Sequence, residues 1–366
     1  MNSTTIGGLL KINHIITTIS YGGAENQLLI LVKEQIKQGH DVTVYPLKGK
    51  IQLSDFFISS GAKVDMVFHN IGFIKQIFAI RKIKFLPREV IHAHLPQAEI
   101  LMYFAKCNLK ISSRHFGGKF YPKAPKFIST LLSRFFLRNT KEVIAISDFV
   151  KTYLLESGEV SRNQEITTIK YGFDAEEFKK SISIHNQIPA KEIARCGTLA
   201  RLSPEKDLQT LIKSIAICKN KFNRKFELHL YGEGNEESKL RNLANSLGID
   251  QEVIFHGKTQ SPADAFKSFD LFILTSRFEG FGMVLLEAMA MGNRIIASNI
   301  PTAHEVLGDD GAAVYFETGN PYDLAEKILA ICSISTNNYE ELQAARLELF
   351  SANAMAKKIE SVYYSN

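Results

Sequence analysis

Two glutamates lie eight positions apart in an otherwise apolar stretch in the second half of the chain. Glu279 and Glu287 belong to the segment SRFEGFGMVLLEAMAMGNRII, with two glycines between them. Burying an unpaired carboxylate costs several kcal/mol, so we expect both side chains to border a polar crevice. There they could accept hydrogen bonds from the hydroxyl groups of a ligand. The alternative is that Glu279 only favours the start of a helix by its charge and that Glu287 faces solvent.

The surrounding sequence predicts a strand, a loop and a helix in that order. LFILTS (271–276) predicts a buried strand, RFEGFG contains turn residues, and MVLLEAMAM predicts a helix with an apolar face. Gly280 and Gly282 would let the backbone approach a ligand closely. The new helix would present unpaired N–H groups and the positive end of its dipole, which together favour a phosphate.

Two cations, Arg201 and Lys206, follow another predicted strand, IARCGTLA (193–200). Cations at a strand end can neutralise a diphosphate leaving group as charge develops on it. The alternative is an ordinary solvated arginine and lysine on the protein surface.

Strand-like apolar runs alternate with helix-length stretches along the chain, which predicts parallel sheets with right-handed crossovers. The clearest runs cover residues 12–19, 41–47, 89–95, 142–147, 226–232, 253–257, 271–276 and 294–298. The pattern occurs twice, on either side of a polar stretch at 179–192. We therefore expect an α/β protein with two doubly wound, Rossmann-like domains at 1–185 and 186–345, facing a ligand-binding cleft. We expect a last helix, within 346–366, to pack back on the first domain.

Composition and charge narrow the class of protein. Hydrophobic residues make up 45% of the 366, enough for the cores of two domains. The four cysteines form no C-x-x-C pair, which argues against a zinc site or a disulfide framework. The start lacks a charged signal-peptide region, and no window reaches the roughly 18 uninterrupted apolar residues of a membrane span. We expect a cytoplasmic protein.

The basic charge is concentrated in the first half. Residues 1–185 contain 25 lysines and arginines against 15 acidic residues, whereas residues 186–366 contain 19 against 23. Such asymmetry favours an anionic partner for the first half, although an ordinary solvated basic surface would look the same.

EGFGMVLLEAMAMGNRIIAS closely resembles the signature E-G-F-G-x-x-x-x-E-A-M-A-x-G of glycosyltransferase family 4, the retaining nucleotide-sugar transferases with the GT-B fold. The resemblance implies that Glu279 binds sugar hydroxyls of the donor and that Glu287 binds the ribose. It also implies that backbone amides meet the sugar and the diphosphate. Those amides belong to Gly280, Phe281, Gly282, Met283 and Val284.

Other segments resemble the family in the expected order, over roughly residues 10 to 345. RCGTLARLSPEKDLQTLIKS resembles the segment with an arginine and a lysine five apart, here Arg201 and Lys206, although Ala200 replaces the usual glycine. YGEGNEESKL, with Gly232, resembles the G-x-G turn that lines the nucleotide base.

The first half also matches, less specifically. YGGAENQLL resembles the loop after the first strand, where Gly22 and Gly23 would admit donor phosphate or acceptor. SSRHFGGKF would place His115 near the anomeric carbon, with its side chain or backbone aiding the transfer. A plain tight turn and a structural histidine are the alternatives.

The resemblance implies transfer of a hexose or N-acetylhexosamine from a UDP- or GDP-sugar to a hydroxyl of a glycan or lipid-linked acceptor. It also implies retained anomeric configuration and a place in bacterial O-antigen, capsule or lipopolysaccharide assembly. We find no D-x-D metal motif, so we expect Arg201 and Lys206 to replace a metal ion. The catalytic set would be His115, Arg201, Lys206 and Glu279.

Two basic, apolar segments, 71–85 and 120–139, suit peripheral contact with anionic membrane at the cytosolic face of the inner membrane. The alternative is that their apolar faces are ordinary core. Competing functions are a nucleotide-sugar epimerase of the same architecture and, less well supported, a nucleic-acid-binding protein. A nicotinamide oxidoreductase is disfavoured because ISYGGAEN lacks the G-x-G-x-x-G spacing, and no recognised nucleic-acid module occurs.

Overall fold

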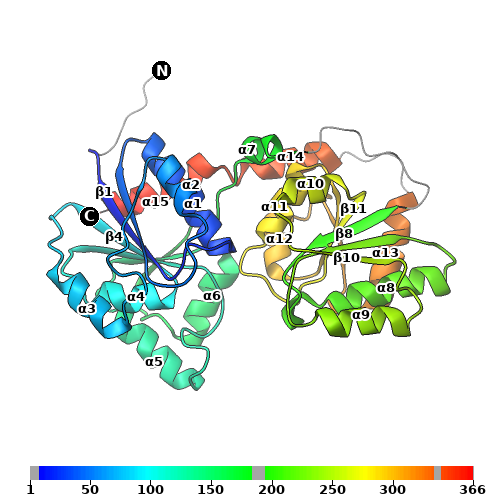
Figure 1. Ribbon diagram of the computed structural model, residues 1–366, viewed down its shortest axis with the longest axis horizontal. Helices are drawn as coiled ribbons and strands as arrows, with labels where there is room; N and C mark the ends of the chain where they lie inside the picture. The colour runs from blue at the N-terminus through cyan, green and yellow to red at the C-terminus, as the bar shows by residue number, and fades with distance from the viewer. Residues whose placement is uncertain (1–7, 184–193, 334–338, 366) are drawn as a thin grey trace. The chain divides into compact units, whose positions relative to one another are not determined.

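The computed structural model describes residues 8–183, 194–333 and 339–365, and the chain divides into two compact units. Residues 1–173 and 350–366 form unit 1, and residues 174–349 form unit 2 (Figure 1). The boundary expected between residues 185 and 186 lies outside the described residues. The division falls between Phe173 and Asp174 because helix α7 (Ala175–Lys180) packs against a helix of unit 2.

Unit 1 contains a sheet of seven parallel strands in the order β3-β2-β1-β4-β5-β6-β7. Its strands are β1 (Lys11–Ile16), β2 (Asp41–Pro46), β3 (Lys63–Val64), β4 (Glu89–His94), β5 (Leu109–Arg114), β6 (Glu142–Ala145) and β7 (Glu165–Thr168). Most of β1, β2 and β4 is buried, as expected of parallel strands covered on both faces.

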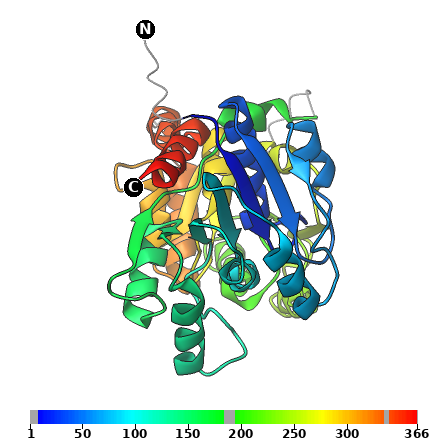
Figure 2. The ribbon, with the colours of Figure 1, turned by 90° about the vertical axis from the view of Figure 1, so that its left-hand side faces the viewer.

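Helices cover both faces of this sheet. They are α1 (Gly23–Lys37), α2 (Ser54–Ser59), α3 (Phe73–Lys82), α4 (Pro96–Tyr103), α5 (Lys126–Leu137), α6 (Asp148–Ser157) and α15 (Ala352–Tyr364). One core cluster joins Leu28 of α1 and Ile359 of α15 to the sheet, and another joins Ile80 of α3 and Leu101 of α4 to it. The last helix, α15, packs against α1 and so belongs to unit 1 (red in Figure 2).

Unit 2 has a sheet of six parallel strands in the order β10-β9-β8-β11-β12-β13. Its strands are β8 (Arg195–Leu199), β9 (Glu227–Tyr231), β10 (Val253–Gly257), β11 (Leu271–Leu274), β12 (Arg294–Ser298) and β13 (Val314–Phe316). Its helices are α7, η1 (Pro204–Lys206), α8 (Leu208–Asn220), α9 (Glu237–Ser246), α10 (Pro262–Lys267), α11 (Met283–Ala290), α12 (Pro301–Leu307), α13 (Pro321–Ser333) and α14 (Tyr339–Glu348).

The predicted architecture of two parallel, doubly wound sheets is confirmed, and each of the eight strand-like runs contains a strand. Four strands were not singled out from the sequence: β3, β5, β7 and β13. Within the described residues, every helix is too short or too polar to cross a membrane.

Candidate active site

Lys206 and Glu279 follow neighbouring strands of unit 2 and form an ion pair. Strands β8 and β11 pair in parallel, so the loops after them leave the same edge of the sheet. Lys206 Nζ lies 2.6 Å from Glu279 Oε1, and Ser276 Oγ donates to the same oxygen at 2.6 Å. Their side chains are 20% and 12% exposed. The predicted diphosphate-binding cation and the predicted sugar-binding carboxylate are therefore adjacent and partly shielded from water.

Three further contacts hold these two loops together. Thr275 Oγ1 donates to the carbonyl oxygen of Lys206 at 2.8 Å, and the backbone N–H of Arg277 donates to that of Glu205 at 2.9 Å. The Arg277 guanidinium pairs with Asp207 at 3.0 Å. Thr275, Arg277 and Asp207 were not predicted from the sequence, because nothing in their spacing indicates that the two loops meet.

Arg201 lies on the β8–α8 loop with an exposed side chain, and among the described residues it has no ion-pair partner. Its guanidinium, at the end of a buried parallel strand and on the same loop as Lys206, is well suited to contact an anionic ligand.

The start of α11 carries the backbone groups predicted to bind phosphate. Gly282, the N-cap residue, adopts a left-handed conformation, with φ at +85°, and as a glycine it supplies no side-chain cap. Phe281 is buried, while Met283 and Val284 are half-buried. The first turn of the helix contains no acidic residue.

Glu287 lies in the middle of α11 and is largely withdrawn from solvent. Burial raises the pKa of its carboxyl group to about 7. A carboxyl group in such a place can accept hydrogen bonds from ligand hydroxyls when it is ionised, which is what binding of a ribose requires.

Gly232 has a structural requirement that the sequence did not reveal. Its φ is +137°, and a Cβ atom there would lie 1.9 Å from the carbonyl oxygen of Ala200. A Cβ atom at Gly234 would lie 2.1 Å from the carbonyl oxygen of Leu202. The G-x-G turn thus packs directly against the backbone on both sides of Arg201 and supports that loop.

In unit 1, Gly22 and Gly23 lie at the start of α1, as predicted from the sequence. The carboxylate of Glu25 folds back over this start, because a Cβ atom at Gly22 would lie 2.3 Å from Glu25 Oε2. A phosphate approaching this helix start would therefore meet a carboxylate, which does not favour Gly22 and Gly23 as a phosphate site.

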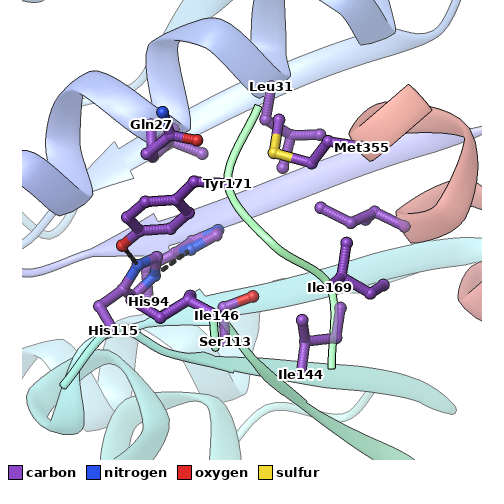
Figure 3. Close-up of a pocket in the computed structure, with 12 residues that line it drawn as sticks. Gln27, Leu31, His94, Ser113, His115, Ile144, Ile146, Ile169, Tyr171 and Met355 are labelled. Carbon is purple, nitrogen blue, oxygen red and sulfur yellow. Dashed lines mark hydrogen bonds between the residues drawn. The ribbon is translucent and has the colours of Figure 1, made fainter. Parts of the chain in front are cut away.

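His115 follows β5, and both of its ring nitrogens are hydrogen-bonded within unit 1. Its Nε2 lies 3.0 Å from His94 Nδ1, and its Nδ1 bonds to the Tyr171 hydroxyl group (Figure 3). Burial lowers the pKa of His115 to about 3, so the ring is neutral at pH 7. It is thus held as a neutral, oriented group rather than as a cation.

The structure therefore groups Lys206, Glu279 and the α11 start in unit 2, with Glu287, Arg201 and Gly232 on the same or adjoining elements. His115, Gly22 and Gly23 lie in unit 1.

Two family models match most of the chain, one in each half. Residues 183–346 match the model described as glycosyl transferases group 1, and residues 21–177 match the model described as glycosyltransferase family 4. The chain belongs to glycosyltransferase family 4. Its signature segment around Glu279 and Glu287 lies in the first match, as the resemblance implied.

Curated relatives of this family 4 glycosyltransferase are distant. The poly(ribitol-phosphate) alpha-N-acetylglucosaminyltransferase of Staphylococcus aureus is 26% identical over 44% of this chain and 34% of its own length. The phosphatidyl-myo-inositol mannosyltransferase of Mycobacterium leprae is 22% identical over 93% and 92% of the two chains. The O-antigen biosynthesis glycosyltransferase WclY of Escherichia coli is 28% identical over 46% and 45%. The chain thus spans less than half the length of two of these three relatives.

Solved structures share the fold of this family 4 glycosyltransferase. A glycosyltransferase from Rickettsia africae superposes with a TM-score of 0.77 at 19% identity, covering 97% of both chains. Anabaena HepE, solved with UDP-glucose, superposes with a TM-score of 0.76 at 19% identity, covering 96% of this chain and 98% of its own. The expected GT-B fold is confirmed by these superpositions.

Proposed function

We propose that this protein moves a hexose or N-acetylhexosamine from a nucleoside-diphosphate sugar to a hydroxyl group of a glycan or lipid-linked acceptor, with retention of anomeric configuration. The observation that carries the proposal is the Lys206–Glu279 pair, in which Glu279 directly precedes the start of α11 with its N-cap residue Gly282. This arrangement offers a cation and backbone N–H groups for a diphosphate, and a carboxylate for sugar hydroxyls.

Distant relatives support the choice of donor and the biological role. HepE has been solved with UDP and with UDP-glucose, and the relatives named above include enzymes of O-antigen, ribitol-phosphate polymer and phosphatidylinositol glycosylation. By analogy, we propose a UDP- or GDP-sugar as donor and a role in bacterial cell-surface polysaccharide assembly at the cytosolic face of the inner membrane.

The bond changes of the proposed reaction balance without a covalent intermediate. The bond from the anomeric carbon to the donor phosphate oxygen breaks, and a bond to the acceptor oxygen forms on the same face. The acceptor proton passes to the departing diphosphate. Arg201, Lys206 and the α11 amides would stabilise the charge on that diphosphate, so that the protein contributes orientation and charge stabilisation.

We propose that these cations make a divalent metal unnecessary. Turnover should then be unchanged after treatment with EDTA. Loss of turnover in the chelator, with recovery on adding Mg²⁺ or Mn²⁺, would contradict this part of the proposal.

The surface of α5 supports contact with a membrane. This helix buries Ser129, Ser133 and, at its end, Leu137, and it exposes Phe127 and Leu131, which are 66% and 61% accessible. An apolar face turned outward, beside Lys126, is the reverse of an ordinary surface helix. The alternative that this segment's apolar face is core does not hold for α5, and we propose that the face contacts anionic lipid.

The proposed function is tested first by thermal shift with UDP, GDP, ADP and their sugars. Binding stabilises the fold by mass action, so the correct nucleotide should raise the melting temperature. With that donor, sugar transfer to acceptors is followed by NMR, which also reports the anomeric configuration of the product.

Two outcomes would favour a different function. Conversion of the donor into an isomer with no acceptor present would favour the epimerase. Strongly salt-dependent binding of unrelated oligonucleotides, without nucleotide-sugar binding, would favour a nucleic-acid-binding protein.

A further inference from the structure

Unit 1 buries a row of histidines on one face of its sheet. His14 of β1 and His92 of β4 are register partners, and His94 of β4 is the partner of Ser113 of β5. Side chains two positions apart on a strand share a face of the sheet. The three histidines and Ser113 therefore all point to the side that α1 and α15 cover. His14, His92 and His94 are each at most 2% exposed. A cluster this well buried must satisfy its ring nitrogens internally.

Hydrogen bonds join these rings to Gln35 of α1. His115 Nε2 lies 3.0 Å from His94 Nδ1, and His94 Nε2 lies 3.0 Å from His14 Nδ1. His14 Nε2 lies 2.8 Å from the amide oxygen of Gln35. At the outer end, the Tyr171 hydroxyl bonds to His115 Nδ1.

The line of hydrogen bonds continues from the amide nitrogen of Gln35. The Gln35 nitrogen donates to the Tyr363 hydroxyl of α15 at 3.2 Å. Tyr363 lies 2.7 Å from His92 Nδ1, and His92 Nε2 lies 2.7 Å from Ser113 Oγ. Eight side chains are thus linked in one continuous line, which we call the histidine chain. Its members are Tyr171, His115, His94, His14, Gln35, Tyr363, His92 and Ser113.

The Gln35 amide determines the direction of every bond in the histidine chain. Its oxygen can only accept, so His14 must carry its proton on Nε2 and accept on Nδ1. His94 must then donate from Nε2, and His115 must do the same. Tyr171 is left to donate to His115 Nδ1. On the other side the Gln35 nitrogen can only donate, so Tyr363 accepts from it and donates to His92 Nδ1, and His92 donates to Ser113.

These bond directions require neutral histidine rings, since only a neutral imidazole has one donor and one acceptor nitrogen. Burial lowers the pKa of His14 to about 4 and places the pKa values of His92 and His94 well below the ordinary range. The cavity beside His94, Ser113, His115 and Tyr171 has a volume of about 20 Å³ and is otherwise lined mainly by aliphatic side chains (Figure 3). There is room for about one water molecule, so bulk solvent does not interrupt the line.

The end of the histidine chain at Tyr171 is also anchored to α1. Gln27 donates to the carbonyl oxygen of Gly172 at 2.8 Å, and its amide oxygen accepts from the N–H of Gly172 at 3.2 Å. These bonds hold the segment that carries Tyr171 against the helix that carries Gln35.

We propose that the histidine chain fixes His115 as the tautomer with its proton on Nε2, so that Nδ1 presents a lone pair to a hydroxyl group. Gln35, His14 and His94 are then positioning residues for His115. The proposal rests on the proposed role of His115 in sugar transfer. In the structure the hydroxyl at Nδ1 is that of Tyr171. A hydroxyl of an acceptor or donor sugar would be recognised in the same way, as a hydrogen-bond donor.

Gln35 is the one member whose chemistry sets the direction, since each histidine and hydroxyl in the chain can bond either way. Turning its amide by 180° would reverse all seven bonds and move the His115 proton to Nδ1, which would then repel a donor hydroxyl. Gln35→Met keeps the side-chain length and removes both the acceptor and the donor.

The test is ¹⁵N NMR of histidine-labelled protein, with single His→Asn variants to assign the rings. In the parent, the spectra should show His14, His92, His94 and His115 as Nε2–H tautomers. In Gln35→Met, His115 should become a mixture of the two tautomers, and kcat for sugar transfer should fall at least about tenfold, with KM for the donor little changed. Gln35→Glu retains an acceptor for His14 and should keep the parent tautomer at His115.

The matched control is Gln76→Met in the same unit. Gln76 is a buried glutamine whose nitrogen donates to two backbone carbonyls, of Leu47 and Phe68. Its loss should lower stability comparably and leave both the His115 tautomer and the kcat of the folded protein unchanged.

Three results would overturn the proposal. The first is an Nδ1–H tautomer at His115 in the parent, and the second is an unchanged tautomer in Gln35→Met. The third is zinc or another transition metal bound stoichiometrically to purified protein through His14, His92 and His94, whose nitrogens lie close enough to share an ion. The NMR readout needs no substrate, so these failures are distinct from the absence of any sugar transfer, which would refute the proposed function instead.

Discussion

At the scale of single residues, the candidate active site holds opposite charges that satisfy one another before a ligand arrives. Lys206 and Glu279 are paired at 2.6 Å, with Ser276 donating to the same carboxylate oxygen. A diphosphate would compete for the lysine and sugar hydroxyls would compete for the glutamate, so each partner can be exchanged without leaving a charge unpaired. This explains how Glu279 persists in a largely apolar segment.

Replacing Lys206 should lower the rate of sugar transfer and change the stability of the protein little. Lys206→Ala should lower kcat/KM for sugar transfer by about 10²- to 10³-fold, because the developing diphosphate charge loses one preorganised donor. The free energy of unfolding should change by less than about 1 kcal/mol, since the pair is partly solvated. Initial rates and thermal denaturation measure the two effects. Lys239→Ala is the control, as it breaks the Lys239–Glu236 pair at the start of α9 and should leave the rate unchanged. Parent-like turnover in both Lys206→Ala and Glu279→Ala would refute the proposed site.

Glu287 should make nucleotide affinity depend on pH. Its carboxyl pKa is raised to about 7 by burial, and the ionised form is the one that would accept hydrogen bonds from ribose hydroxyls. Affinity for the nucleotide should therefore rise as pH increases from 6 to 8. Glu287→Gln should remove this part of the pH dependence of the affinity. Calorimetric titration at several pH values measures this.

The same shift has a consequence for stability. Because the folded-state pKa lies above the unfolded value, the folded protein binds more protons between about pH 4.5 and 7, and this group's contribution to stability falls as pH rises through that window. Glu287→Gln should raise the melting temperature at pH 8 while weakening nucleotide binding. A lower melting temperature at pH 8 would show that the carboxylate is stabilised by contacts other than a ligand.

At the scale of elements, the turn after β9 supports the loop after β8. Gly232 and Gly234 allow their backbone to lie against Ala200 and Leu202, while the N–H of Leu202 donates to the carbonyl oxygen of Glu233 at 3.0 Å. The G-x-G pattern is thus required by packing between two loops, independently of any nucleotide. Arg201 lies between the two contact points and would move with them.

Gly232→Ala should destabilise the protein by about 3 kcal/mol or more, because it combines a strained φ with a collision against backbone. Gly248→Ala is a matched control. Gly248 also has a positive φ, +67°, but a Cβ atom there meets nothing within 4 Å, so its loss should be limited to about 1–2 kcal/mol. Denaturant unfolding of both variants tests the difference. Equal losses would show that the collision is relieved by loop movement.

At the scale of the whole molecule, charge and exposed apolar surface are unevenly distributed. The first half of the sequence is basic, and unit 1 also contains the outward-facing apolar side chains of α3 and α5. Ile74 and Phe78 of α3 are 71% and 62% exposed. Basic and apolar groups together bind anionic lipid more strongly than either does alone.

Phe127→Ser combined with Leu131→Ser should weaken sedimentation with anionic vesicles at physiological salt by at least about tenfold, because two large apolar side chains no longer enter the lipid. The control is Phe56→Ser combined with Ile58→Ser on α2, which removes similarly exposed apolar surface from the same unit. Absence of vesicle binding by the parent protein would remove the membrane proposal without affecting the transferase proposal.

The sequence by itself determined the order and type of most elements. Continuous apolar runs predicted β1, β2, β4, β6 and β9 to β12, because strands buried on both faces need apolar side chains at nearly every position. The signature around Glu279 predicted a strand, a turn and a helix, and the structure has β11, a loop and α11 there. These are local properties, fixed by the spacing of residues along the chain.

Strand β5 shows where local reasoning fails. LKISSR has only two aliphatic residues, yet it lies inside the sheet, where Arg114 pairs with Glu99 at 2.7 Å and with Glu159 at 3.0 Å. The buried arginine is tolerated because Glu99 of α4, Ser133 of α5 and Glu159 of the loop after α6 supply its partners.

Tertiary structure alone decided which distant residues meet. The Lys206–Glu279 pair depends on β8 and β11 being neighbours, and the histidine chain depends on three strands and two helices from opposite ends of the sequence. The outward face of α5 likewise follows from which side of the helix the sheet covers. Hydrophobic periodicity identifies an element, but strand order and packing are global, since they depend on every element being placed at once.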